Sequence, residues 1–126
     1  MNLQNTDPEY TQRLGAFLEE VRNEPDSMLE PTTRWLAILA TLTGNGSVDA
    51  YKEALPQALQ EGLDPVAVKE MVYQATDYLG YGRALPFLHA TNDALTAAGI
   101  ALPLPGQATT TMNDRLEKGI AAQVKI

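Results

Sequence analysis

The chain of 126 residues contains no cysteine and has one histidine, His89. The lack of cysteine excludes disulfides, thiolate metal sites and thiol nucleophiles together. A lone histidine also excludes a histidine-rich zinc site, and no Asp/Glu cluster has the spacing of a known calcium loop. We therefore expect no metal and no other cofactor.

Basic residues are also few, and they are scattered singly. Nine Lys and Arg stand against 16 Asp and Glu, which gives a net charge of −7. We expect no nucleic-acid partner, because phosphate binding needs clustered Lys and Arg. No apolar run approaches the ~20 residues of a membrane span, and the start, MNLQNTDPEY, lacks signal-peptide features. These absences predict a cytoplasmic protein without a membrane partner.

What the chain does contain is helical periodicity. A hydrophobic content of 44% with 20% charged residues is ordinary for a globular protein, and the length suits one domain over residues 1–126. The long periodic segments follow the helical repeat, and no segment has the alternating pattern of a β-hairpin. We predict an all-α fold of about six helices.

The first predicted helix begins near Pro8, which suits a first helical position, with Thr6 at capping-box spacing from a glutamate. One stripe of this helix is apolar and consists of Tyr10, Leu14, Phe17, Leu18 and Val21. Pro25 and Pro31 must break the chain. The next segment, residues 32–44, is apolar on nearly every side, which predicts the buried central helix.

Proline and glycine set the limits of the following helices. Pro56 should kink or shorten the helix in which it lies. Asp64 and Pro65 have the pattern of a helix start. The helix after them ends in a glycine-containing joint, and the next one should begin after Gly82, since Pro86 fits only in a first turn.

The C-terminal part is expected to be less compact. Residues 100–112, rich in Pro, Gly and Thr, should be extended, and residues 113–126 should form a last helix. Leu116, Ile120 and Val124 are spaced for one apolar face of that helix. Since exposed apolar faces usually mark interfaces, we expect a homo-oligomer in which this part lies partly against a neighbouring subunit.

The most distinctive segment is a predicted helical hairpin over residues 62–95. Its first helix carries Glu70, followed by Gln74, Tyr78 and Gly80 in the pattern Q-x-x-x-Y-x-G, ahead of an alanine-rich second helix. This sequence pattern resembles that of the carboxymuconolactone decarboxylase family, within the larger group of alkyl hydroperoxidase D-like proteins. The resemblance implies a helical bundle around a central hairpin, and a trimer or hexamer with pockets near subunit contacts. It also extends to the N-terminal half of longer members that carry two such domains in tandem.

The resemblance leaves parts of the family's chemistry unmatched. In the alkyl hydroperoxidase D-like branch the site is a Glu, then C-x-x-C, then a His. Counting from Glu70 aligns His89 with that histidine, whereas anchoring on Gly80 aligns Leu88. In either alignment no cysteine is present, which predicts no thiol-dependent peroxidase activity. The decarboxylases themselves place a histidine on the preceding helix, at the position of Ala54.

A polar strip follows the first hairpin helix at helical spacing and consists of Glu70, Tyr73, Gln74 and Asp77. If it faces a pocket, Glu70 would act as acid and base while Tyr73 or Tyr78 donates to a developing oxyanion. If it faces water, it is only a solvated surface. The resemblance favours Glu70, because an acidic residue recurs there in the family's site.

Two arginines are placed to hold a substrate carboxylate. These are Arg34, near the start of the helix over residues 32–44, and Arg83 at the hairpin joint. A cation at a helix start has an unfavourable position in the helix dipole, so a partner such as Glu30 or Asp77 is expected for either arginine. Both arginines could equally be structural.

The remaining candidate site residues, two tyrosines and the histidine, each have a functional and a structural interpretation. Tyr78 and Tyr81 flank Gly80 and would form an aromatic wall, or else pack with their hydroxyls at the surface. His89 would be a catalytic helper, or else a packed and hydrogen-bonded residue.

Two functions follow from the resemblance. The first is a decarboxylase or lyase that acts on a carboxylated lactone or a related acid of aromatic catabolism, with Glu70 as the acid/base, Arg83 as the carboxylate clamp and His89 as a helper. The second is a catalytically degenerate domain that serves in oligomerisation or binding. The missing thiols and the missing histidine favour the second.

Overall fold

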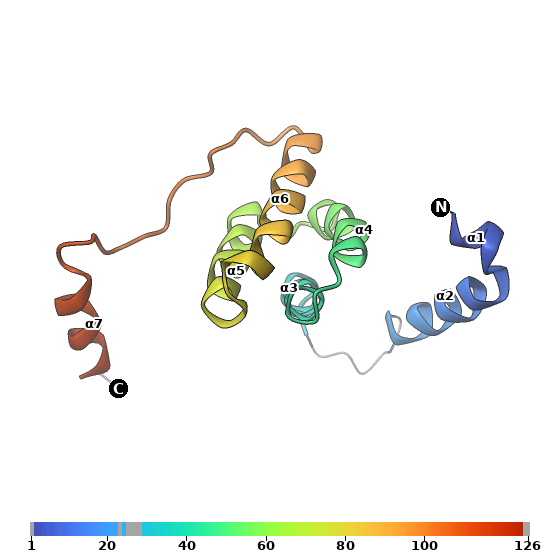
Figure 1. Cartoon of the computed structure of the whole chain (residues 1–126), viewed down its shortest axis with the longest axis horizontal. Coiled ribbons are helices and arrows are strands. Elements are labelled where there is room, and N and C mark those ends of the chain that lie inside the picture. Colours follow the sequence, from blue (N-terminus) through green and yellow to red (C-terminus); the bar gives the residue numbers. More distant parts are fainter. Residues whose placement is uncertain (1, 23, 25–28, 125–126) are drawn as a thin grey trace. The chain divides into compact units, whose positions relative to one another are not determined.

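A computed structural model describes residues 2–22, 24 and 29–124. The chain divides into two compact units, Met1–Glu30 and Pro31–Ile126. The described residues form seven helices, and no strand is found among them (Figure 1). The all-α prediction is therefore confirmed. Within the same residues, no helix is both long enough and apolar enough to cross a membrane.

The first unit contains α1 (Leu3–Thr6) and α2 (Pro8–Arg22). Pro8 is the first residue of α2, as predicted. The prediction that Thr6 caps this helix is wrong, because Thr6 is the last residue of α1 and its hydroxyl donates to the Asp7 carboxylate at 2.6 Å. With Pro8 at the first helical position, the cap position falls on Asp7, one residue later than the spacing suggests.

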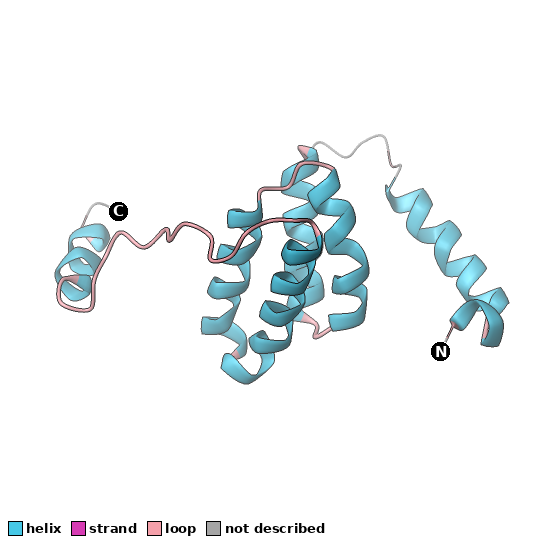
Figure 2. Cartoon of the chain, turned by 90° about the horizontal axis from the view of Figure 1, so that it is seen from above, coloured by secondary structure: helices cyan, strands magenta, loops and turns pink. Residues whose placement is uncertain are grey.

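The second unit contains a bundle of four helices. These are α3 (Pro31–Gly44), α4 (Val48–Gln60), α5 (Pro65–Leu79) and α6 (Tyr81–Ala97). α3 packs against α4 and α5, and α6 packs against the same two helices (labelled in Figure 1; Figure 2 shows the bundle from above). Their buried faces and Leu63, which lies between α4 and α5, share one core. It consists of Trp35, Leu39, Tyr51, Leu55, Ala58, Leu63, Val68, Val72, Phe87 and Ala90.

α3 is not the most buried helix of the bundle, so that expectation is wrong. It contributes three buried residues, whereas α6 contributes five. The exposed positions of α3 include Ala37, Ala40 and Thr41. Their small side chains make the sequence look apolar on every side while adding little surface that needs burial. The chain break at Pro31 agrees with the start of α3, and Pro25 lies outside the described residues.

The predicted start of the hairpin is confirmed. The Asp64 carboxylate accepts a hydrogen bond from the Val66 N–H at 3.0 Å, and Pro65 occupies the first turn of α5. This arrangement satisfies one of the N–H groups that a helix start leaves without a partner, and the missing N–H of proline does no harm there.

One residue, Gly80, joins α5 to α6. Its backbone φ of 81° is one that residues other than glycine rarely adopt. α6 starts directly after Gly80, at Tyr81. Pro86 therefore lies in the second turn of α6 rather than in the first, and that prediction is wrong. Pro56 likewise lies inside α4, which continues to Gln60 without being shortened.

The last described helix is α7 (Arg115–Gln123), which has no buried residue. Residues 101–114 contain no helix or strand. The apolar face expected here is exposed; it consists of Leu116 and Ile120 on α7 and of Val124, which directly follows the helix.

An aromatic contact holds α4 and α6 together in the core of the bundle. The rings of Tyr51 and Phe87 meet edge to face, with centroids 5.2 Å apart and an interplanar angle of 86°. The buried Thr91 hydroxyl donates a hydrogen bond to the Phe87 carbonyl at 2.8 Å. The Thr91 oxygen therefore accepts a hydrogen bond from the Tyr51 hydroxyl, also at 2.8 Å. Burial raises the pKa of Tyr51 above its ordinary value of 10.0, against a smaller opposing effect of the hydrogen bond to Thr91.

Replacing Tyr51 with Phe removes the hydroxyl and keeps the ring. We expect the free energy of unfolding at neutral pH to fall by about 1 kcal/mol, the usual net value of a hydrogen bond. In the wild type, stability should also fall as the pH rises past 10.0, since Tyr51 then ionises in the unfolded chain before it does so in the folded one. Urea unfolding at neutral and alkaline pH measures both effects. Exposed Tyr10→Phe is the control, and an equal alkaline loss in Tyr51→Phe and wild type would contradict the assignment.

Candidate functional site

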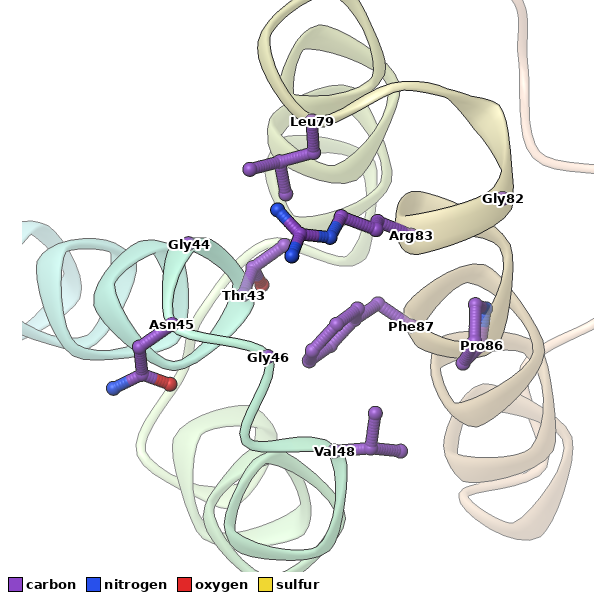
Figure 3. A pocket seen from close by; sticks show the side chains of 10 residues that line it. All are labelled: Thr43, Gly44, Asn45, Gly46, Val48, Leu79, Gly82, Arg83, Pro86 and Phe87. Carbon is purple, nitrogen blue, oxygen red and sulfur yellow. The ribbon is translucent and has the colours of Figure 1, made fainter.

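A cavity of about 310 Å³ opens at one end of the bundle (Figure 3). It lies where α3 ends, α4 begins, α5 ends and α6 begins. It is lined by Thr43, Gly44, Asn45, Gly46, Val48, Leu79, Gly82, Arg83, Pro86 and Phe87. All of these residues belong to the second unit of the chain.

The turn from α3 to α4 supplies one wall of the cavity. Gly46, with a φ of 79°, stands just after the helix end. Its N–H bonds to the Thr43 carbonyl at 3.2 Å, and the Ser47 N–H bonds to the Leu42 carbonyl at 2.9 Å. This pair of bonds is the Schellman arrangement, which fixes the chain as it leaves a helix. The wall is therefore built from ordered backbone.

Three of the lining residues are glycines, and these meet the cavity through backbone atoms only. A Cβ atom built on Gly44, Gly46 or Gly82 would find no atom within 4 Å beyond the neighbouring residues and the backbone of its own helix. Glycine at position 46 is explained by the positive φ of that residue. Gly82 has no such explanation, because it lies in a helix, where glycine is less favourable than alanine. The open space beside Gly82 lets a ligand approach the helix backbone closely.

Among the described residues that line the cavity, only Arg83 has an ionisable side chain. Figure 3 shows its side chain extending from α6 toward Thr43, while the ring of Phe87 points toward Gly46. The guanidinium forms no hydrogen bond and no ion pair with any other described residue. The expected partner carboxylate of Asp77 is therefore not found. A cation near a helix start without a protein partner is available to an anionic ligand.

The polar atoms of the lining divide into donors and acceptors. The Thr43 hydroxyl gives its proton to the Leu39 carbonyl at 2.8 Å, which leaves its oxygen as an acceptor. The Asn45 side-chain oxygen accepts from the Ser47 N–H at 3.1 Å, so its amide N–H groups are the free donors of that side chain. The apolar part of the cavity comes mainly from Val48, Leu79 and Phe87.

The other predicted site residues do not line this cavity. Tyr78 and Tyr81, expected to form an aromatic wall, are 87% and 68% exposed. Tyr73 on α5 and His89 on α6 are also exposed, and Arg34 is half-buried on α3. Arg83 is thus the one predicted residue that the structure places in the cavity wall.

Glu70 lies half-buried on α5, away from the residues that line the cavity. Its carboxylate makes no hydrogen bond or ion pair with the rest of the described chain. The other members of the predicted polar strip, Tyr73, Gln74 and Asp77, are exposed. Most of the strip is therefore solvated surface. In the described ranges, no three or more acidic or histidine side chains gather in a way that could hold a metal ion.

Sequence reasoning missed a buried lysine on the same helix. Lys69 is 9% exposed, and its ammonium donates to the Asn92 side-chain oxygen at 2.7 Å. It also lies 5.4 Å from the centre of the Tyr73 ring, within cation–π range. The hydrogen bond to Asn92 joins α5 to α6, whereas the contact with Tyr73 lies within α5. The sequence did contain a signal of this burial. Lys69 stands beside Val68 and one turn before Val72, on the apolar face of the helix.

The turn between α3 and α4 was also missed as part of a site. It brings Thr43, Asn45 and Val48 to the cavity from a segment far from the hairpin in sequence. The two glycines of this turn, Gly44 and Gly46, were visible in the sequence. They were interpreted only as the end of a helix and not as part of a site.

Residues 8–93 match the Carboxymuconolactone decarboxylase family. The match includes every residue that lines the cavity, and the chain belongs to this family. The resemblance inferred from the hairpin is thus confirmed. No curated protein and no solved structure matches the chain.

Proposed function

We propose that the protein binds a small carboxylated molecule in the cavity between α3, α4, α5 and α6, with Arg83 pairing with the carboxylate. The observation that carries this proposal is the unpaired guanidinium of Arg83 on the cavity wall. Arginine binds carboxylates through two parallel N–H bonds, which fixes the orientation of the ligand as well as its charge.

The size and lining of the cavity support a compact ligand. Its volume of about 310 Å³ lies at the lower end of the range for small-molecule sites, about 300 to 1,000 Å³. Val48, Leu79 and Phe87 offer apolar contacts to the hydrocarbon part of such a molecule. A small cyclic acid of the kind met in aromatic catabolism meets these requirements.

The lining favours binding over turnover at this position. General acid/base catalysis needs a group that exchanges a proton near the working pH, within hydrogen-bond reach of the substrate. An arginine guanidinium does not fill this role, because arginine side chains do not lose a proton in proteins, and no other described residue of the lining has an ionisable side chain. A binding domain without catalytic activity is therefore the function that this geometry supports best.

Replacing Arg83 with Gln removes the charge and keeps a polar side chain. We expect the affinity for a simple carboxylate such as phenylacetate to fall about 10- to 100-fold, because a hydrogen bond to a charged group contributes roughly 1.5–3 kcal/mol. Isothermal titration calorimetry at low salt measures this difference.

Arg115→Gln is the matched control for Arg83→Gln, since Arg115 is also an exposed arginine and lies outside the cavity lining. The proposal predicts that Arg115→Gln binds phenylacetate like the wild type. It also predicts that phenylacetamide, which has no charge, binds the wild type only weakly. Equal affinities of Arg83→Gln and wild type for phenylacetate would refute the carboxylate clamp.

A second candidate function is a lyase or decarboxylase that acts on a carboxylated lactone, with Glu70 as the acid/base and His89 as a helper. It is favoured by the half-buried position of Glu70 and by the lack of a partner for its carboxylate in the described chain. Such a carboxylate is available to form a hydrogen bond with a substrate. Tyr78 and Tyr81 would then border the reacting molecule.

Glu70→Gln separates this candidate from simple binding. If Glu70 moves the proton, the substitution should lower the rate of carbon dioxide release from a carboxylated lactone by about 10²- to 10⁴-fold. A coupled assay of carbon dioxide release measures the rate, and Glu53→Gln, an exposed glutamate on α4, is the control. Turnover that survives in Glu70→Gln would remove Glu70 from the mechanism.

We also propose a homo-oligomer, a trimer or hexamer, in keeping with the family resemblance. Two exposed apolar faces support this proposal: one on α2, which includes Phe17 and Leu18, and one on α7, which includes Leu116 and Ile120. Multi-angle light scattering should report several subunits at micromolar concentration. A monomer under those conditions would contradict the assembly.

A further inference from the structure

Pro86 removes a hydrogen-bond donor from the wall of the cavity. In a regular α-helix, the N–H of each residue bonds to the carbonyl four residues earlier. Pro86 lies inside α6 and has no N–H, so the carbonyl of Gly82 lacks its usual helical donor. Gly82 and Pro86 both line the cavity, and Gly82 can do so only with backbone atoms.

The same backbone defect occurs elsewhere in the bundle without a cavity beside it. Pro56 lies inside α4 and leaves the carbonyl of Lys52 without its i+4 donor. Neither Lys52 nor Pro56 lines the cavity. All four residues are exposed, so water can reach the carbonyls of both Lys52 and Gly82 when no ligand is bound. The two pairs differ in the cavity beside Gly82, and Lys52 with Pro56 serves as an internal reference for the cost of a helical proline.

The lining of the cavity thus places the side chain of Arg83 next to Gly82, the residue whose carbonyl lacks its usual helical donor. Arg83 directly follows Gly82, and both belong to the first turn of α6. The oxygen of Thr43 adds a second acceptor on the opposite wall, because its proton is already given to Leu39. A ligand whose carboxylate meets Arg83 leaves these acceptors to be filled by hydroxyl or ammonium groups of the same molecule.

We infer that the cavity selects hydroxy or amino carboxylates, with the Gly82 carbonyl accepting a hydrogen bond from the hydroxyl or ammonium group of the ligand. This inference rests on the proposed binding of a carboxylate by Arg83. Pro86 is then a specificity-determining residue, which acts by keeping the Gly82 carbonyl available. A carboxylated lactone without an O–H or N–H group fits this site less well than a hydroxy acid of the same size.

The test compares two probes that differ by one hydroxyl, mandelate and phenylacetate. Calorimetry on the full chain should show that the wild type prefers mandelate by about two- to tenfold, the effect of one net hydrogen bond on affinity. In Pro86→Ala the new N–H bonds to the Gly82 carbonyl, and the preference should fall to about one. Lost contacts with the proline ring weaken both probes alike, so the ratio reports on the carbonyl.

Pro56→Ala is the matched control, since it restores the same type of helical bond away from the cavity. Both substitutions should raise the Tm, because alanine is far more favourable than proline inside a helix. Only Pro86→Ala should lose the preference for mandelate. This combination separates an effect on the ligand from an effect on the stability of the bundle.

The outcomes also separate this inference from the proposed function. Carboxylate binding that depends on Arg83, together with no preference for mandelate or with a preference that survives in Pro86→Ala, overturns the role of the Gly82 carbonyl alone. No binding of either probe by the wild type overturns both. A preference that is lost in Pro86→Ala and kept in Pro56→Ala supports the inference.

Discussion

The edge-to-face contact between Tyr51 and Phe87 is the interaction on which the candidate site depends. It joins α4 to α6 in the core, and Phe87 also forms part of the cavity lining. Arg83 lies one helical turn before Phe87, so the contact that positions the ring also positions the guanidinium. The hydrogen bonds from Tyr51 to Thr91 and from Thr91 back to the Phe87 carbonyl hold this part of α6 from within the core.

Around that contact, the cavity wall departs from the rules that favour a stable helix. Gly82 is a helical glycine with free space where a Cβ would stand, Pro86 interrupts the helical bonding, and Arg83 is a cation near a helix start. Each feature is unfavourable in a helix, and all three border the same cavity. Proteins often break such local rules at functional or strained sites, although Pro56 shows that one broken rule alone does not mark a site. Their coincidence at one place is therefore a stronger sign of a site than any one of them alone.

Sequence reasoning predicted the helices well, because their apolar residues follow the helical repeat and Asp64-Pro65 is an unambiguous start signal. It selected Arg83, which the structure places in the first turn of α6 and in the cavity lining. It missed the opposite wall, since nothing local in residues 43–48 indicates that they meet α6; that neighbourhood arises only from tertiary packing. It also misplaced Pro86, because a one-residue joint at Gly80 starts α6 earlier than the glycines suggest. Lys69 was missed because its partner, Asn92, lies on another helix.

The most direct test of the central claim is an NMR titration that follows the glycine amides as phenylacetate is added. If the carboxylate binds beside Arg83, the signals of Gly44, Gly46 and Gly82 should shift together, because these backbones line the cavity. The signals of Gly62 and Gly99, which also have positive φ but lie outside the lining, should stay in place. Saturable shifts confined to residues around Glu70 and His89, or no saturable shifts at all, would contradict a carboxylate site in this cavity.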